Sequence, residues 1–147
     1  MRIRPATLDD LPTLIGLANN SRTAAHWSRQ QCEAALSNDA NRTALVAEDG
    51  AGIHGFLVAR CLDQEWELEN VVVAPDSQRR GIGSRLLDEF LNIARSRSAK
   101  AVFLEVRESN HPARKLYEEA GFLESGRRRN YYRDPAEDAL TYSLELT

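Results

Sequence analysis

The sequence VVVAPDSQRRGIG at residues 71–83 decides the fold, because it joins an apolar run, a proline, two arginines and two glycines within thirteen positions. The β-branched run at its start is typical of a strand, and Pro75 ends that strand because proline has no N–H to donate to a neighbour. Apolar residues then recur at helical spacing over residues 86–94, which predicts a helix from about Gly81 to Arg97. The segment therefore predicts a strand, a basic loop and the start of a helix.

A loop of this kind can hold a phosphate group. The first N–H groups of a helix lack partners within the helix and lie at the positive end of its dipole. Gly81 and Gly83 allow the backbone to approach an anion, and Arg79 and Arg80 add positive charge. The alternative is that the glycines only form a tight turn, and the spacing does not decide between the two. The segment matches neither the dinucleotide fingerprint nor the P-loop.

The rest of the chain predicts a mixed α/β fold, with elements in the order β-α-α-β-β-β-α-β-α-β-β. Further strands are expected at residues 1–6, 43–48, 53–60, 66–73 and 101–106, and two more between residues 122 and 146, joined by a turn at Asp134-Pro135. Further helices are expected at residues 7–18, 28–36 and 111–121, with Thr7 and Ser28 as N-caps. We expect a single domain over residues 1–147.

Composition excludes several classes of protein. The 147 residues are 42% hydrophobic and 28% charged, with no apolar run near the roughly 20 residues of a membrane span. The first residues lack the apolar stretch of a secretory signal, which favours a cytoplasmic protein without a membrane partner. The net charge of −3 argues against direct nucleic-acid binding. The two cysteines and three histidines stand apart in the sequence, so no metal site is expected.

Several segments together resemble the GNAT superfamily of acyltransferases. QRRGIG at residues 78–83 is similar to its pyrophosphate motif [QR]-x-x-G-x-[GA]. LEVRESN at 104–110 and ARKLYEEAGF at 113–122 resemble its strand, its N-x-x-A-x-x-x-Y helix and its G-F turn. RRNYY at 128–132, EDA at 137–139 and Trp27-Ser28 are similar to the protein N-terminal acetyltransferases, and nearest to the ribosomal-protein alanine branch called RimI.

This resemblance implies a central, mostly antiparallel mixed sheet flanked by about four helices, with acetyl-CoA as cosubstrate and no metal. Two neighbouring strands would splay apart to admit the pantetheine arm of the coenzyme. Residues implied to line that arm are Val71, Val72 and Val73, and those implied to hold the pyrophosphate are Arg79, Arg80, Gly81, Ile82, Gly83 and Ser84. Asn110 would bond the arm, although its position also suits a helix cap.

Two residues are the candidates for catalysis. Glu105 lies within an apolar strand, where burial would suit a general base, or it is a glutamate on the exposed face of an edge strand. Its match in the superfamily deprotonates the incoming amine through water. Tyr117 matches a tyrosine that protonates the leaving thiolate, although its helix face also suits a core tyrosine.

Other residues are candidates for binding the acceptor. Tyr131 and Tyr132 match tyrosines that hold the backbone of the substrate, with a cross-strand aromatic pair as the alternative. Glu67 and Glu69 point to the same side of their strand, where one of them would bind substrate or receive a proton, or both are simply solvated.

Three functions remain open at this point. The first is transfer of acetyl to the free N-terminal α-amine of a protein, such as a ribosomal protein that starts with alanine, by direct attack in a ternary complex. The second keeps the fold but acts on a lysine, a polyamine or another small amine. The third is a coenzyme-binding module or partner subunit without turnover. The chain departs from the nearest branch at Ser77, where an aromatic is common, and at His111-Pro112.

Overall fold

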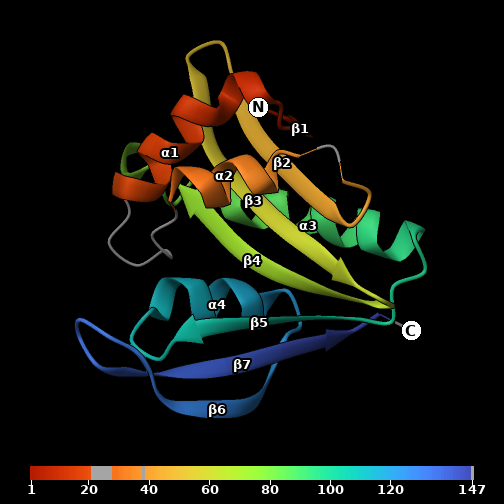
Figure 1. Ribbon diagram of the computed structural model, residues 1–147, viewed down its shortest axis with the longest axis vertical. Coiled ribbons are helices and arrows are strands. Elements are labelled where there is room, and N and C mark those ends of the chain that lie inside the picture. The colour runs from red at the N-terminus through yellow and green to blue at the C-terminus, as the bar shows by residue number, and fades with distance from the viewer. Residues whose placement is uncertain (21–27, 38, 147) are drawn as a thin grey trace.

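The computed structural model describes residues 1–20, 28–37 and 39–146, so the predicted feature at Trp27 lies outside the described residues. These residues form the predicted elements in the predicted order (Figure 1). The strands are β1 (Arg2–Pro5), β2 (Arg42–Asp49), β3 (Gly52–Leu62), β4 (Glu65–Val73), β5 (Ala101–Arg107), β6 (Leu123–Tyr132) and β7 (Glu137–Glu145). The α-helices are α1 (Leu11–Asn20), α2 (Arg29–Ala35), α3 (Ile82–Ser96) and α4 (His111–Glu119), with short 3-10 turns η1 (Leu8–Asp10) and η2 (Pro75–Ser77).

All seven strands belong to one sheet in the order β1-β2-β3-β4-β5-β7-β6. Neighbours pair antiparallel except β4 and β5, which run parallel. The prediction of a mixed, mostly antiparallel sheet flanked by four helices is therefore confirmed.

Helices cover both faces of the sheet, with α1 and α2 in front of it and α3 behind it in Figure 1. Residues of β3 alternate between two apolar clusters, as expected for a strand buried on both faces. Leu57 and Ala59 pack with α3, whereas Phe56 and Val58 pack with α1 and α2. Within the described part of the chain, no helix is long and apolar enough to cross a membrane.

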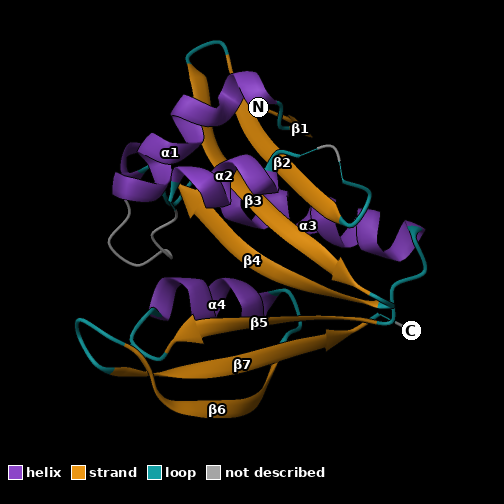
Figure 2. Cartoon of the chain, viewed as in Figure 1, coloured by secondary structure: helices purple, strands orange, loops and turns teal. Residues whose placement is uncertain are grey.

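The parallel pair β4 and β5 is short. The strands pair only from Glu65 with Ala101 to Glu67 with Phe103, and then diverge (Figure 2). Just beyond this point a β-bulge interrupts the pairing with β3, because Val58 opposes Asn70 while Ala59 opposes Leu68. Glu69 is the extra residue, and a bulge of this kind bends and twists its strand. The bend coincides with the place where β4 leaves β5.

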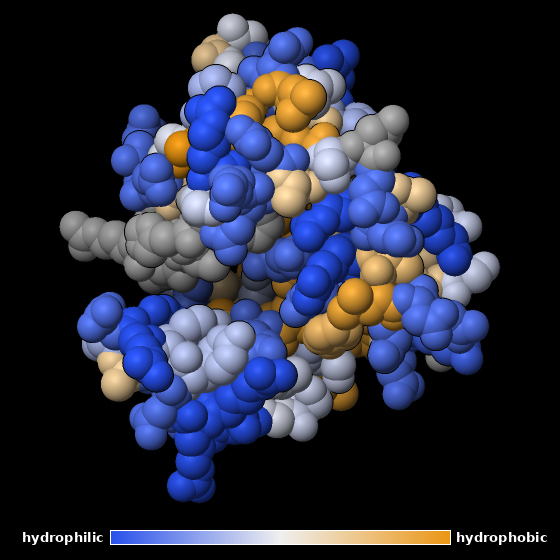
Figure 3. Space-filling model, in the orientation of Figure 1, coloured by the Kyte–Doolittle hydropathy of each residue, from blue (hydrophilic) through white to orange (hydrophobic). Residues whose placement is uncertain are grey.

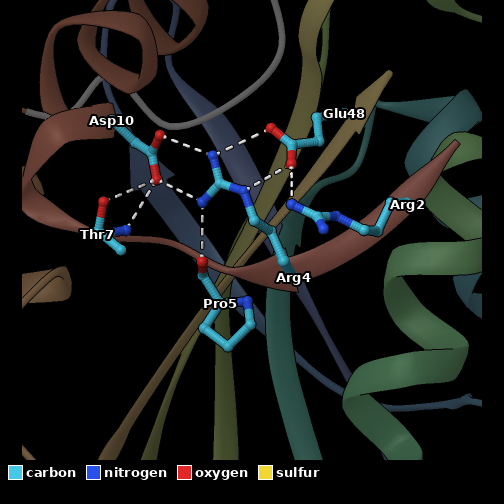
Figure 4. Close-up of polar contacts among 6 residues, drawn as sticks. All are labelled: Arg2, Arg4, Pro5, Thr7, Asp10 and Glu48. Atoms are coloured by element: carbon cyan, nitrogen blue, oxygen red, sulfur yellow. Dashed lines mark hydrogen bonds and ion pairs between the residues drawn. The ribbon is translucent and has the colours of Figure 1, made fainter. Parts of the chain in front are cut away.

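The N-terminal strand is fixed by a cluster of charged groups (Figure 4). The guanidinium of Arg4 donates to both carboxylate oxygens of Asp10, at 2.9 and 3.0 Å, and to Glu48 of β2 at 2.8 and 3.1 Å. Asp10 also accepts a hydrogen bond of 2.8 Å from the backbone N–H of Thr7, the predicted cap. The hydrogen bonds from Arg4 hold the pKa of the Asp10 carboxyl below its usual range. The cluster joins β1, the start of the first helical segment and β2.

We expect Asp10→Asn to lower the free energy of unfolding by about 1–2 kcal/mol at pH 7. The change removes the charge-assisted pair between Arg4 and Asp10, and the partly buried guanidinium of Arg4 loses that partner. The depressed pKa means that the carboxylate stabilises the fold fully above about pH 4, the usual pKa of aspartate. This contribution is lost as the pH falls below that value through the folded pKa. Urea unfolding at pH 7 and pH 2.5 measures both effects, with the exposed neighbour variant Asp9→Asn as control. A constant difference between wild type and Asp10→Asn at both pH values would contradict the prediction.

Candidate active site

The loop between β4 and α3 has the backbone of an anion-binding turn. Arg79 and Gly81 have positive φ angles of 67° and 77°, and α3 begins directly afterwards at Ile82. A positive φ is uncommon for a non-glycine residue, and such residues concentrate at functional sites. Left-handed residues that alternate with residues of other conformation point successive backbone N–H groups to one side. These N–H groups add to the positive potential at the N-terminal end of the helix dipole. The predicted phosphate loop therefore has the conformation that an anion site needs.

The residues predicted to hold the coenzyme do not all present side chains to one place. Arg79, Arg80, Gly81 and Ser84 are exposed, whereas Ile82 is buried in the core and offers a ligand only its backbone. Of the three valines, Val71 and Val73 pack on the α3 face of the sheet. Val72 points to the opposite face and packs with α1 and α2. The alternation of a strand requires this division.

A cavity of about 260 Å³ lies between α3 and α4. Its lining residues are Ser84, Leu87, Asp88, Leu116, Glu119 and Ala120. A Cβ on Gly83 would lie 3.4 Å from Leu116 Cδ2, an ordinary van der Waals contact, so α4 packs against the first turn of α3. The start of α3 and the inner side of α4 thus border one space, on the same face of the sheet as Val71 and Val73.

A second cavity, of about 330 Å³, involves residues of α2, β2, β4, β5 and β6. We call it the acceptor cleft. It is lined by Gln31, Ala34, Arg42, Glu67, Leu68, Glu69, Glu105, Tyr131 and Tyr132. Four residues predicted from the sequence to act on the acceptor, Glu67, Glu105, Tyr131 and Tyr132, meet here although they come from three different strands.

Glu105 lies in β5, between β4 and β7, so the alternative of an exposed edge-strand glutamate is wrong. Its neighbours Leu104 and Val106 point to the α3 face, which leaves Glu105 facing the acceptor cleft. One carboxylate oxygen, Oε1, lies 3.3 Å from the guanidinium of Arg128. The other, Oε2, is buried and has no hydrogen-bond partner within the described part of the chain. A buried carboxylate oxygen without a donor is rare in proteins and marks a place for water or a ligand.

Tyr117 lies on the opposite face of the sheet from Glu105. Its ring packs 5.8 Å from that of Phe122 and 6.5 Å from that of Tyr142, in the core cluster of α3. Burial raises the pKa of its phenol far above the ordinary value, and the nearby Tyr132 raises it further. The phenol therefore stays protonated at neutral pH, as a proton donor must.

Tyr131 and Tyr132 both reach the acceptor cleft because β6 is irregular. The pairing of β6 with β7 shifts between Arg128 and Tyr132, and Asn130 has a positive φ of 52°. In a regular strand these neighbours would point to opposite faces, but here their rings meet edge to face at 5.2 Å. They are therefore neighbours on one strand, and the alternative of a cross-strand pair is wrong.

Tyr132 connects the two candidate catalytic residues. Burial first, and then the negative charge of Glu105, raises the pKa of Tyr132 to about 12. Tyr132 in turn raises the pKa of Tyr117. The guanidinium of Arg107 lies over the Tyr132 ring, 4.3 Å from its centre, and fixes its orientation by a cation–π contact. A ligand that reached Tyr132 in the acceptor cleft would lie beside Glu105, which lines the same cleft.

The two glutamates of β4 face the cleft together, as predicted, but each has an arginine partner. Glu67 accepts a hydrogen bond of 2.6 Å from Arg60, and Glu69 accepts one of 2.8 Å from Arg42. Burial raises the pKa of Glu69, and the positive charges of Arg42 and Arg60 oppose this shift. With Arg128 beside Glu105, every carboxylate of the cleft is balanced by a cation.

Asn110 has the structural role that was the alternative to coenzyme binding. Its side-chain oxygen accepts a hydrogen bond of 3.2 Å from the N–H of Ala113 and caps α4. Contact with the coenzyme arm stays a prediction. Over residues 1–20, 28–37 and 39–146, no group of three or more His, Cys, Asp or Glu side chains is placed to hold a metal ion.

The sequence comparison identifies the family. A profile described as the acetyltransferase (GNAT) family matches residues 10–122. The chain belongs to the GNAT acetyltransferase family. As a GNAT protein it is an acetyl-CoA-dependent N-acetyltransferase, which confirms both the predicted enzyme class and the predicted cosubstrate.

Relatives within the GNAT family point to one branch. The chain is 39% identical over 105 residues to the ribosomal protein bS18-alanine N-acetyltransferase of Salmonella typhimurium, and the match covers 70% of each chain. It is 47% identical over 77 residues to the N-alpha-acetyltransferase RimI of Mycobacterium tuberculosis, covering 52% of this chain and 47% of that one. The crystal structure of the ribosomal-protein-S18-alanine N-acetyltransferase from Escherichia coli superimposes with a TM-score of 0.90 at 30% identity, covering 99% of this chain and 94% of that one.

Several residues of the GNAT site were not predicted from the sequence. Gln31 and Ala34 of α2 and Arg42 of β2 line the acceptor cleft, and Arg128 pairs with Glu105. No local signal marks them, since an arginine in a basic run is ordinary solvated surface until the fold brings it to a carboxylate. Hydrophilic side chains cover most of the visible face over β6 and β7 in Figure 3.

We expect Gly81→Ala to weaken the binding of coenzyme A and to lower the free energy of unfolding by about 1–2 kcal/mol, the cost of a left-handed backbone with a Cβ. The φ of 77° at Gly81 is strained for a residue with a Cβ, although that Cβ would meet no neighbouring atom within 4 Å. Gly50→Ala in the β2–β3 turn is a matched control, because that site is also open but is not among the residues with positive φ. Calorimetric titration with coenzyme A and thermal unfolding measure the two effects. Equal behaviour of the two variants would count against the anion-binding loop.

Proposed function

We propose that this GNAT enzyme transfers the acetyl group of acetyl-CoA to the free N-terminal α-amine of a protein, with a ribosomal protein that begins with alanine as the acceptor. Two observations carry the proposal: Glu105 and Tyr117 lie on opposite faces of the sheet, and β4 diverges from β5 just before Glu105. The names of the relatives support the choice of acceptor. Such an acceptor would place the reaction in the cytoplasm.

The coenzyme would occupy the α3–α4 side of the sheet. The loop at residues 79–84 offers N–H groups and arginine charge to the pyrophosphate. Val71 and Val73 line the approach to the point of divergence, where β4 has left β5. Backbone N–H groups along the separated strand edge are suited to polarise the thioester carbonyl. These features support the predicted coenzyme residues, with Val72 and Ile82 contributing only backbone.

The acceptor would approach from the other face, through the acceptor cleft. Its α-ammonium group would meet the free oxygen of Glu105. Arg128 is a weak competitor for that carboxylate, since its side chain is 60% exposed and easily hydrated. Tyr131 and Tyr132 present one hydroxyl each to the backbone of an incoming peptide, and Glu67 lies beside them.

The reaction needs no protein nucleophile. The thioester of acetyl-CoA supplies an activated acyl carbon. Glu105 takes the proton of the ammonium group, directly or through water, and so frees the nitrogen lone pair. The nitrogen–carbon bond forms, the carbon–sulfur bond breaks, and Tyr117 donates a proton to the departing sulfur. The raised pKa of Tyr117 keeps this proton in place until it is needed. The nitrogen then loses its second proton, which returns through water to the Tyr117 phenolate, and Glu105 releases the first proton to solvent.

The whole chain, residues 1–147, is proposed to act as one domain. The sheet supports this, because the first strand, β1, and the last strand, β7, belong to the same seven-stranded sheet. The structural match over 99% of the chain supports it further.

A peptide assay tests the acceptor. Acetyl-CoA is offered with peptides that start with Ala, Ser or Met, each with a free and a blocked α-amine, and fragment mass spectrometry locates the acetyl group. We expect acetyl on the free α-amine, with Ala preferred and the blocked peptides unmodified. Acetyl on lysine alone, or turnover with polyamines only, would move the enzyme to the small-amine class.

Glu105→Gln tests the base. The change keeps the shape of the side chain but removes its basicity, and we expect kcat to fall about 100-fold or more while acetyl-CoA binding is unchanged. Glu65→Gln, at the exposed start of the neighbouring strand β4, is the matched control and should keep wild-type kcat. Full activity of Glu105→Gln would rule out this role. Binding of acetyl-CoA by the wild type without turnover of any amine would instead indicate a module that only binds the coenzyme.

Tyr117→Phe tests the acid. The variant keeps the buried ring and loses only the hydroxyl, so we expect the fold to persist and kcat to fall about 10-fold or more. Tyr142→Phe is the matched control, since Tyr142 lies in the same core but its hydroxyl is held by Arg114 and Glu118. The loss of kcat in Tyr117→Phe should be smaller when the substrate is an acetyl thioester of a more acidic thiol, because the thiolate of such a thiol leaves without being protonated. Equal losses with both thioesters would contradict the assignment.

A further inference from the structure

Three polar side chains form a hydrogen-bonded relay beside the phosphate loop. His54 Nε2 of β3 lies 2.7 Å from Asp49 Oδ1, and His54 Nδ1 lies 2.8 Å from Ser77 Oγ. The other oxygen of Asp49 lies 4.0 Å from the guanidinium of Arg80. The relay therefore runs from the β2–β3 hairpin to the loop that follows β4, and none of its members belongs to the catalytic arrangement.

The order Asp–His–Ser matches that of a hydrolase triad, but this serine cannot act as a nucleophile. Ser77 is only 3% exposed and lies within the turn η2, so no substrate carbonyl can reach it. A buried polar group fully satisfied by hydrogen bonds has instead the effect of fixing the elements that it joins. The relay is thus suited to holding the loop.

His54 holds the turn η2 at two points. Its backbone carbonyl accepts a hydrogen bond of 2.8 Å from Ala74, which precedes the turn, while its ring meets Ser77 at the end of the turn. Ser77 also donates its own N–H to Ala74. Two residues after Ser77 the chain enters the left-handed conformation at Arg79, which is uncommon for a residue with a side chain. Because the turn η2 is held in place, the strained loop that follows it stays in one conformation.

We propose that His54 is a positioning residue for the coenzyme, which acts through Ser77 to hold the loop at residues 78–81 in the conformation that binds the pyrophosphate. The inference rests on the proposed placement of the pyrophosphate at this loop. It predicts an effect on the affinity for phosphate-bearing coenzyme and none on the chemical step, because His54 touches neither the acceptor cleft nor Tyr117.

Two substitutions of His54 separate its two hydrogen bonds. The amide of asparagine lies where Nδ1 lies in histidine, so His54→Asn can keep the bond to Ser77 and lose the bond to Asp49. The longer glutamine places its amide near the position of Nε2, so His54→Gln can keep the bond to Asp49 and lose the bond to Ser77. Ser77→Ala removes the same bond from the other side.

The test compares acetyl-CoA with S-acetyl-pantetheine, which carries the same thioester but no phosphate. For His54→Gln and Ser77→Ala we expect KM for acetyl-CoA to rise about 10-fold with kcat unchanged, as the loss of one buried hydrogen bond would give. We expect kcat/KM for S-acetyl-pantetheine to stay at the wild-type value in every variant. His54→Asn should remain close to wild type with both substrates.

Four outcomes would overturn the proposal. A parallel loss with both thioesters would show a general structural effect, and equal behaviour of His54→Asn and His54→Gln would show that the bond to Ser77 is not responsible. If the wild type prefers acetyl-CoA to S-acetyl-pantetheine, unchanged KM values in all variants would contradict the role of His54 but not the placement of the pyrophosphate. A wild type without that preference would overturn the placement of the pyrophosphate as well.

Discussion

The separation of β4 from β5 is the constraint on which the site depends. The two strands are parallel neighbours and pair over three positions only, after which each retains a partner on its outer side, β3 for β4 and β7 for β5. A sheet that continued to pair here would place a closed wall between the two faces. Because it does not, the sheet is open along β5 beside Glu105, which faces the α2 side, while Tyr117 packs on the opposite, α3 side. The proposed general base and the proposed general acid therefore lie on different faces of the sheet.

Local departures from regular strand geometry supply the rest of the site. The bulge at Glu69 shifts the register of β4 against β3 where β4 leaves β5, and Glu69 lines the acceptor cleft together with Glu67. The shift in β6 turns Tyr131 and Tyr132 to the same side. Left-handed residues at Arg79 and Gly81 orient the loop before α3. Each irregularity interrupts ordinary pairing or helix geometry, and each lies where a ligand is expected to bind.

Charge balance inside the cleft has a chemical consequence. Three carboxylates converge there, and isolated anions in a partly buried site would repel one another and resist ionisation. Arg60, Arg42 and Arg128 each pair with one of them, which keeps the cleft close to neutral. The three pairs differ in exposure. The pair of Arg42 with Glu69 is the most buried and is structural in character, whereas Arg128 at Glu105 is the most exposed and the easiest for an incoming ammonium group to displace.

The sequence alone determined the elements, their order and the family resemblance, because hydrophobic period, caps and glycine positions are local properties. It also singled out Glu105, Tyr117 and the loop at residues 78–83, since those motifs are contiguous. Only the tertiary structure decided that Glu105 is central in the sheet, that Val71 and Val73 meet α3 while Val72 meets α1 and α2, and that Arg128 and Arg42 belong to the cleft. These facts depend on strand order, on bulges and on contacts between residues far apart in the chain. No local pattern encodes them, because the free energy that selects them comes from packing the whole sheet between its two layers of helices.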